Sequence, residues 1–295
     1  MEYDDRLRQA QRTKYDCLLF DLDDTLYPLN SGLAAACRKN IEDYMDQKLG
    51  IEKSKISEMC NLLYKTYGTT MAGLRTIGYD FNYNDYHSFV HGRLPYEKLK
   101  PDPVLRNLLL SLPLRKVIFT NADRVHAAIV LGKLGLEDCF EGVICFETLN
   151  PMDNNNVSSD EGVDSMCGGS VSTTTGSESF DIFGHFAQPN AGSQLPKTPI
   201  LCKPSEDAIE QALRIANIDP TRTIFFDDSV RNIESGKRIG LNTVLVGTSQ
   251  RTKGADFALE SIHNIREALP ELWEVEEKSE VRYSGEIAIE TSVRA

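Results

Sequence analysis

The chain has 295 residues, of which 41% are hydrophobic, so it can bury a core in one large domain or in a domain with a smaller accessory unit. Its formal net charge of −12 argues against nucleic acid or an anionic membrane surface as a partner, because both would repel it. Seven scattered cysteines without a CxxC pair indicate neither a disulfide framework nor a zinc motif. We therefore expect a reducing, cytoplasmic location, with the nucleus as the alternative. The sequence shows neither the apolar core of a signal peptide nor the run of roughly eighteen apolar residues that a membrane span needs.

Short apolar runs predict the strands of a sheet. Five buried strands are expected, at Cys17 to Phe20, Lys116 to Thr120, Gly142 to Cys145, Thr223 to Phe226 and Thr243 to Val246. Helical patterns at Arg124 to Leu134, Ser205 to Ala216 and Val230 to Ile239 separate most of them. Strands and helices in alternation predict an α/β fold, in which helices cover both faces of a parallel sheet.

The first interval is too long for one crossover, since about ninety residues separate the first two strands. Amphipathic helices are predicted at Ser31 to Lys48, Ser54 to Tyr67 and Asn82 to His91, with YGTTMAGLRTIGYD between the second and the third. Three prolines, Pro95, Pro101 and Pro103, mark the return. We expect a helical domain at 30–96, inserted into a core made of 1–29 and 97–273.

Residues 151–195 form a second interruption, which is rich in Asn, Ser, Thr and Gly and poor in large apolar side chains. Such a segment cannot bury enough apolar surface to order itself, so a disordered loop is expected within the core. The acidic segment 274–295 is expected to be a flexible tail.

Polar side chains stand where the predicted strands end. They are Asp21 and Asp23 after the first strand, Thr120 and Asn121 at the second, Asp227 and Asp228 at the fourth, and Lys203 before a helix. In an open parallel sheet, ligands bind beyond the carboxyl ends of the strands, near the point where the strand order changes direction. We therefore expect carboxylates, a hydroxyl and an ammonium group at one edge of the sheet.

The clustered carboxylates predict a metal ion. Asp21 suits attack on a phosphoryl group, with formation of an aspartyl phosphate. Because a carboxylate repels a phosphate dianion, a cation has to neutralise both. We expect Mg²⁺ at Asp21, at the backbone carbonyl of Asp23 and at Asp228, with Asp227 binding it directly or through water.

The remaining groups suit the other steps of phosphoryl transfer. Thr120 and Lys203 would hold the phosphoryl oxygens as charge shifts in the transition state. Asp23 would protonate the leaving oxygen and later activate the water that releases phosphate.

These motifs, DLDDTLY, TN, Lys203 and DDS in this order and spacing, resemble those of the haloacid dehalogenase-like (HAD) hydrolase superfamily. The stretches FDLDDTLYPLNSGL, YGTTMAGL and FFDDSVRNI resemble its pyrimidine 5'-nucleotidase branch. The resemblance implies a Rossmann-like core with an inserted helical C1 cap. It also implies the roles already given for Asp21, Asp23, Thr120, Lys203 and Asp228.

The resemblance further implies that a cap segment lines the substrate pocket. Its residues are Thr69, Thr70 and Arg75, and Asn121 of the core is assigned to substrate binding with them. Arg75 suits a surface ion pair equally well.

The leading hypothesis is a Mg²⁺-dependent phosphomonoesterase of a small metabolite, with a pyrimidine nucleoside 5'-monophosphate as the first candidate. The alternatives are a phosphatase of a sugar phosphate, phosphoglycolate or a lysophospholipid-like ester, and a non-catalytic regulatory protein of the same fold. A dehalogenase needs no acid at Asp23, and a helical cap should exclude a protein substrate.

Four other residues have plainer interpretations. His126 is interpreted as a capping or packing residue. His87 and His91 lie one helical turn apart, but without a third ligand they are interpreted as a solvated face of the cap. Cys202 is interpreted as a small buried residue, because no histidine partner is evident.

Overall fold

The computed structural model describes residues 14–151, 180–187 and 194–273. These residues contain a six-stranded sheet in the order β3-β2-β1-β4-β5-β6, and every neighbouring pair is parallel. The strands are β1 (Cys17–Phe20), β2 (Arg115–Phe119), β3 (Gly142–Ile144), β4 (Thr223–Asp227), β5 (Asn242–Val246) and β6 (Phe257–Leu259). The predicted α/β fold is confirmed, and five strands lie within one residue of the predicted bounds. The edge strand β6 was not predicted, because three residues are too short to show a pattern.

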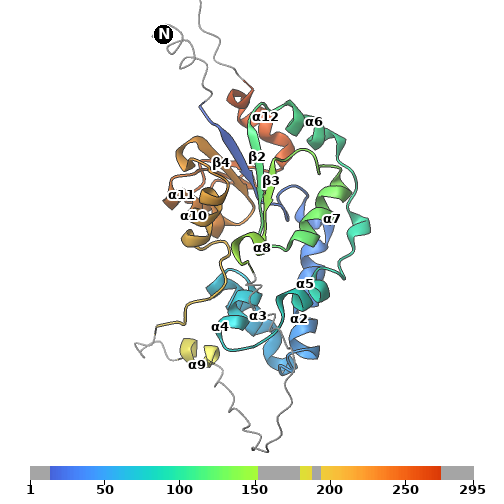
Figure 1. The fold of residues 1–295 in the computed structure, drawn as a ribbon, viewed down its shortest axis with the longest axis vertical. Coiled ribbons are helices and arrows are strands. Elements are labelled where there is room, and N and C mark those ends of the chain that lie inside the picture. The colour runs from blue at the N-terminus through green and yellow to red at the C-terminus, as the bar shows by residue number, and fades with distance from the viewer. Residues whose placement is uncertain (1–13, 152–179, 188–193, 274–295) are drawn as a thin grey trace, which may run out of the picture.

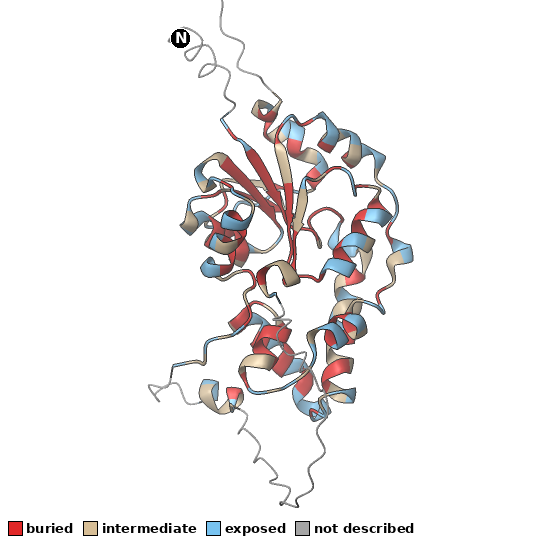
Figure 2. Ribbon diagram, in the orientation of Figure 1, coloured by how far each residue is buried: buried red, intermediate tan, exposed pale blue. Residues whose placement is uncertain are grey.

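Helices cover both faces of the sheet (Figure 1). One face carries α6 (Pro103–Ser111), α7 (Arg124–Leu134) and α12 (Ile265–Ala268), and the other carries α8 (Phe146–Leu149), α10 (Glu206–Ile215) and α11 (Val230–Ile239). Alternation along β1 divides its side chains between the two faces: Leu18 and Phe20 join the first apolar cluster, and Cys17 and Leu19 join the second. The central strands β1 and β4 are accordingly buried along their length, whereas the helices present exposed outer faces (Figure 2).

Four helices between β1 and β2 lie on the side toward which the strands run (Figure 1). They are α2 (Leu33–Gln47), α3 (Lys53–Tyr67), α4 (Thr70–Thr76) and α5 (Tyr83–Val90), all within the predicted insertion at 30–96. Helix α4 was not predicted, because its seven residues include two threonines and Gly73. A Cβ at Gly73 would lie 2.5 Å from the Cβ of Leu63, so the glycine permits α4 to pack closely on α3.

The described part of the predicted disordered insert contains a helix, α9 (Ile182–Ala187). The Phe180 amide donates to the Ile77 carbonyl at 2.9 Å, and Ile182 is buried in the apolar cluster of the cap. The expectation of a loop without structure is therefore wrong for 180–187. The rest of the insert from 152 to 179 and from 188 to 193, and the predicted tail at 274–295, lie outside the described residues.

Short 3-10 helices complete the described structure: η1 (Leu29–Ser31), η2 (Tyr96–Lys98), η4 (Pro220–Arg222), η5 (Ile262–Asn264) and η6 (Pro270–Leu272). Within the described ranges, no helix has both the length and the apolar character that crossing a bilayer requires.

Candidate active site

The order of the strands creates a crevice at the carboxyl end of β1. Strands β2 and β3 lie on one side of β1, and strands β4, β5 and β6 lie on its other side. Ligands bind at such a switch point in parallel sheets. Asp21 follows β1, Thr120 follows β2 and Asp227 ends β4, so the sheet brings all three residues to this edge.

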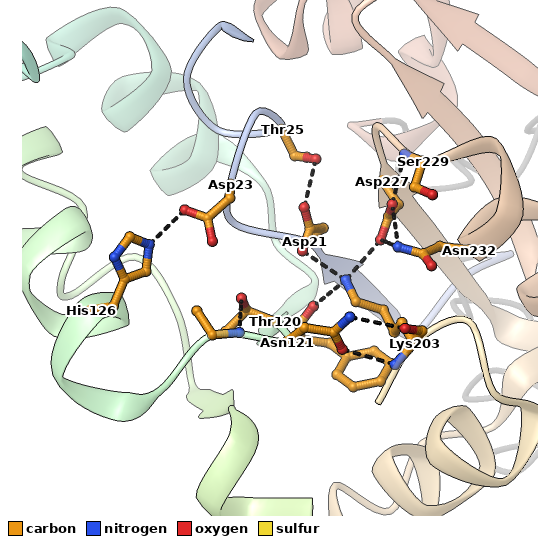
Figure 3. Close-up of polar contacts among 12 residues, drawn as sticks. Asp21, Asp23, Thr25, Thr120, Asn121, His126, Lys203, Asp227, Ser229 and Asn232 are labelled. Carbon is orange, nitrogen blue, oxygen red and sulfur yellow. Dashed lines mark hydrogen bonds and ion pairs between the residues drawn. The ribbon is translucent and has the colours of Figure 1, made fainter. Parts of the chain in front are cut away.

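The Lys203 ammonium group lies at the centre of this edge (Figure 3). Its Nζ donates to Asp21 Oδ1 at 2.7 Å, to Asp227 Oδ2 at 2.8 Å and to the Phe119 carbonyl oxygen at 2.7 Å. These bonds engage all three N–H donors of a side chain that is only 1% exposed. Burial by itself would lower the pKa of Lys203, but Asp21 and Asp227 outweigh it and raise the pKa above its usual value. Lys203 is therefore a fixed positive charge beside Asp21.

Asn121 holds the backbone of Lys203 in place. Its Nδ2 donates to the Lys203 carbonyl oxygen at 3.0 Å, and its Oδ1 accepts from the Lys203 amide at 2.8 Å. These contacts give Asn121 a role in positioning Lys203, and its assignment to substrate binding stays a prediction. The two residues are 82 positions apart, so no local pattern could have paired them.

Three carboxylates gather beside Lys203. Asp21, Asp227 and Asp228 each offer one oxygen within 4.8 Å of the others. Burial raises the pKa of Asp21 and the neighbouring carboxylates add to this effect, although Lys203 opposes it. A cation among the three groups would remove their repulsion, and a set made only of oxygen atoms fits Mg²⁺.

Asp227 and Asp228 differ in how far the protein engages them. Asp227 is fully buried and accepts from Lys203, from the Ser229 amide at 2.9 Å and from Asn232 Nδ2 at 2.9 and 3.1 Å. Asp228 is exposed, and none of the described residues donates to its carboxylate. The free oxygens of Asp228 make it the better direct ligand for a metal ion.

Asp23 points away from this group toward His126 (Figure 3). His126 Nε2 lies 2.7 Å from Asp23 Oδ1, and the Tyr27 hydroxyl donates to the same oxygen at 2.6 Å. Burial opposes ionisation of Asp23, but His126 and the two hydrogen bonds outweigh burial and lower its pKa to about 2. Burial likewise disfavours the charged imidazole, but Asp23 and Asp123 raise the pKa of His126 above its usual value. The two side chains therefore form an ion pair in which His126 is buried and Asp23 is partly exposed.

His126 is buried against the rings of His91 and Tyr96, as expected of a packing residue, but its contact with Asp23 was not predicted. It is 103 positions from Asp23, and only the fold reveals the contact. Its other ring nitrogen, Nδ1, lies 2.8 Å from the Tyr96 hydroxyl, which fixes the orientation of the ring.

Two threonines lie among these side chains. The Thr25 hydroxyl, which sequence analysis did not assign, donates to Asp21 Oδ2 at 3.1 Å. Thr120 is 1% exposed, and its Oγ1 accepts from the Ala122 amide at 3.0 Å, so its hydroxyl proton remains available for another acceptor. Asp24, which directly follows the two motif carboxylates, adopts a left-handed conformation with φ of 60°. Aspartate tolerates this conformation better than most residues.

Two adjoining cavities open between the core and the cap. One of about 330 Å³ is lined by Asp23, Tyr27, Arg38, Thr70 and His126, among others. The second, of about 260 Å³, also reaches Asp23 and includes Thr69 and Asn121 in its lining.

The cap residues predicted to bind substrate are placed differently from one another. Thr70 is buried beside Cys60, and the Thr69 hydroxyl oxygen caps α4 by accepting from the Ala72 amide at 3.1 Å. Arg75 forms an ion pair with Asp80 and lines neither cavity. Arg38, which sequence analysis did not single out, is the arginine at the first cavity.

The interpretation of Cys202 is confirmed, whereas that of His87 is not. Cys202 is buried and its thiol donates to the Tyr67 carbonyl oxygen at 3.3 Å, as expected of a small packing residue. Burial raises the pKa of this thiol to about 11. His87, by contrast, is buried, so the predicted solvated face of the cap is wrong at this residue.

Comparison with known proteins supports the fold and the motifs. Residues 173–246 match the family model described as haloacid dehalogenase-like hydrolase. Phosphate metabolism protein 8 of Saccharomyces cerevisiae is 28% identical over 132 residues, which are 42% of this chain and 41% of that protein. The chain therefore aligns with less than half the length of this curated relative.

Solved structures share the architecture. CbbY from Rhodobacter sphaeroides, in complex with phosphate, superposes with a TM-score of 0.50 and 17% identity over 88% of this chain and 99% of its own. YfnB from Bacillus subtilis, bound to magnesium, has a TM-score of 0.47 and 16% identity over 86% and 97% of the two chains. At these identities the similarity to CbbY shows the fold alone. Together with the family match, it supports the superfamily that the motifs indicate.

Proposed function

We propose that this chain, as a haloacid dehalogenase-like hydrolase, is a Mg²⁺-dependent phosphomonoesterase of small metabolites that acts through an aspartyl phosphate on Asp21. The observation that carries the proposal is the set of contacts around the Asp21 carboxylate. Lys203 holds one oxygen and Thr25 holds the other, so the group is fixed at the mouth of the crevice. A preoriented carboxylate beside a permanent positive charge suits attack on a phosphoryl group.

The acidic residues suit one magnesium ion. Asp21, Asp228 and the backbone carbonyl of Asp23 would hold it, with Asp227 acting through water because protein donors already engage both of its oxygens. When bound, Mg²⁺ would offset the repulsion between the carboxylates and the phosphoryl oxygens. The Thr120 hydroxyl would contact the same phosphoryl oxygens, and Lys203 would reach them by exchanging one of its three present hydrogen bonds.

The Asp23–His126 pair supplies the proton that the leaving oxygen needs. At neutral pH the shared proton resides on His126, because the pKa of Asp23 is lowered and that of His126 is raised. As the ester bond breaks, the His126 proton would move across this hydrogen bond to Asp23 and from Asp23 to the leaving oxygen, which leaves a neutral imidazole and an ionised Asp23. In the second half-reaction, Asp23 takes a proton from the water that attacks the aspartyl phosphate.

The cavity beside Asp23 favours a compact leaving group. Its volume of about 330 Å³ is at the lower end of the range for small-molecule sites. Leu33, Ile41 and Tyr64 give it apolar walls, and Arg38, whose Nε lies 3.1 Å from Glu42 Oε1, adds a guanidinium group. A pyrimidine nucleoside 5'-monophosphate has a flat base with an apolar face and polar edges, which suits such walls. It is our first candidate, ahead of a sugar phosphate, phosphoglycolate or a lysophospholipid-like ester.

The test is phosphate release from a panel of esters by wild type and Asp21→Asn, with Mg²⁺ and with EDTA. The panel contains UMP, CMP, AMP, glucose 6-phosphate, phosphoglycolate and an aryl phosphate. We expect UMP or CMP to lead and EDTA to abolish release. Release that survives EDTA would contradict the metal requirement, and a leading sugar phosphate would change only the substrate. A folded protein that hydrolyses no ester on the panel would favour a regulatory role.

A further inference from the structure

A second cluster of metal-binding side chains lies at the junction of the cap and the core. His87 and His91 lie one turn apart at the end of α5 in the cap, and Asp123 begins α7 in the core. Each offers one ligand atom, and the three atoms lie within 4.8 Å of one another. His91 Nδ1 is hydrogen-bonded to Asp123 Oδ1, and His87 Nδ1 lies 3.6 Å from the same oxygen. Asp123 is thus the third ligand that the histidine pair lacked in the sequence.

His87 is a buried polar group without a partner. It is 6% exposed, and neither ring nitrogen has a hydrogen-bond partner among the described residues. Its ring packs edge-on against Phe146, with the centroids 4.8 Å apart. Buried polar atoms are rarely left unpaired, and such an atom calls for an explanation such as an ion.

We propose that His87, His91 and Asp123 bind one divalent transition-metal ion of the zinc type. Two histidines at positions i and i+4 of a helix, completed by a carboxylate, form a recurrent zinc-binding arrangement. Imidazole nitrogen prefers such ions, whereas the oxygen-only set at Asp21 and Asp228 prefers Mg²⁺. The two sites should therefore bind different kinds of cation. The proposal of this second site does not depend on the proposed function.

The site can be reached from a cavity of about 420 Å³, whose lining includes all three residues and Glu147. A water molecule or Glu147 would complete the coordination. The hydrogen bond between His91 and Asp123 must open as the ion enters, because a bound metal replaces that direct contact. Since α5 belongs to the cap and α7 to the core, a bound ion would tie the two together. The ring of His91 also lies 4.5 Å from that of His126, so the ion would be close to Asp23.

The experiment titrates the full-length chain with Co²⁺, a spectroscopic substitute for Zn²⁺, after metal removal and in excess Mg²⁺ that keeps the acidic site filled. We expect visible absorption bands of nitrogen-bound Co²⁺ that saturate at one equivalent, and Zn²⁺ should displace them. His87→Ala, His91→Ala and Asp123→Asn should each weaken binding at least roughly tenfold, as loss of a metal contact does. His263→Ala is the matched control, because this histidine pairs with Asp102 elsewhere and its loss should leave binding unchanged.

Circular dichroism of each variant separates lost binding from lost folding. His91 is less buried than His87, so His91→Ala provides the decisive variant if His87→Ala does not fold. The proposal is overturned if the folded wild type shows no nitrogen-type Co²⁺ spectrum. It is also overturned if His91→Ala binds as tightly as wild type, or if Asp228→Asn rather than the histidine variants removes the signal. Because the readout is metal binding, failure here leaves the proposed phosphatase activity untouched.

Discussion

Gly68, at the end of α3 in the cap, packs directly against the backbone of Lys203 in the core. A Cβ at Gly68 would lie 2.4 Å from the Lys203 carbonyl oxygen and 2.8 Å from Cδ of Pro204, and the glycine has φ of +89°. Both the space and the backbone conformation therefore require glycine. The cap thus contacts the residue whose ammonium group holds Asp21.

Replacement of Gly68 by alanine should impair catalysis through this contact. The added methyl group must push the cap away from Lys203 or displace Lys203 itself, so we expect kcat/KM to fall by roughly tenfold or more. Gly50→Ala is the matched control, since Gly50 also has a positive φ but nothing lies within 4 Å of its missing Cβ. Equal kinetics for the two variants would show that the contact is immaterial.

Loss of the Asn121 side chain should lower kcat more than it raises KM. Asn121→Ala removes both hydrogen bonds to the Lys203 backbone and frees the buried lysine to shift, which we expect to reduce kcat by roughly tenfold. Asn121→Asp retains an acceptor for the Lys203 amide and should fall between alanine and wild type. A rise in KM at unchanged kcat would instead indicate that Asn121 acts in substrate binding.

Arg38, rather than Arg75, should influence the choice of leaving group. Arg38→Ala removes the positive charge at the cavity, and we expect KM for a nucleotide to rise about three- to tenfold while an aryl phosphate is little affected. Arg75→Ala is the control, because Arg75 is paired with Asp80 outside both cavities. The assignment fails if Arg75→Ala has the larger effect on nucleotide KM.

The ion pair between His126 and Asp23 should make stability depend on pH. The pKa of His126 is raised in the folded protein, so its contribution to the free energy of unfolding is full below about pH 6.5 and is lost as the pH rises through the folded pKa. In EDTA, urea unfolding between about pH 6 and about pH 9 should therefore show a larger loss of stability for wild type than for His126→Gln. The same loss in both proteins would mean that His126 is not charged in the fold.

The sequence was sufficient to predict the features that depend on residues close together in the chain. Strand β1 and the carboxylates that follow it are adjacent in the chain, so an apolar run ending at Asp21 was enough to place them. The elements that were missed are β6 and the helices α4, α6, α8, α9 and α12. All of them except α6 have seven residues or fewer, which is too few for a periodic pattern.

The sequence could not predict the contacts that join distant segments. Asn121 and Lys203 are 82 positions apart, and Asp23 and His126 are 103 apart. His91 and Asp123 are separated by 32 positions, across the boundary between cap and core. These pairs come together only through the order of the parallel strands and the packing of the cap on the core. Neither can be predicted from the spacing of residues within one segment.

The central claim is that Asp21 forms a covalent phosphoenzyme, and acid quenching during turnover tests it most directly. The full-length protein is mixed with Mg²⁺ and its best substrate from the panel, quenched, digested and analysed by mass spectrometry. We predict a phosphoryl group on the peptide that carries Asp21, which disappears in Asp21→Asn together with at least roughly a thousandfold of the activity. A burst of leaving alcohol equal to the enzyme concentration, with no phosphoryl group on that peptide, would contradict the account.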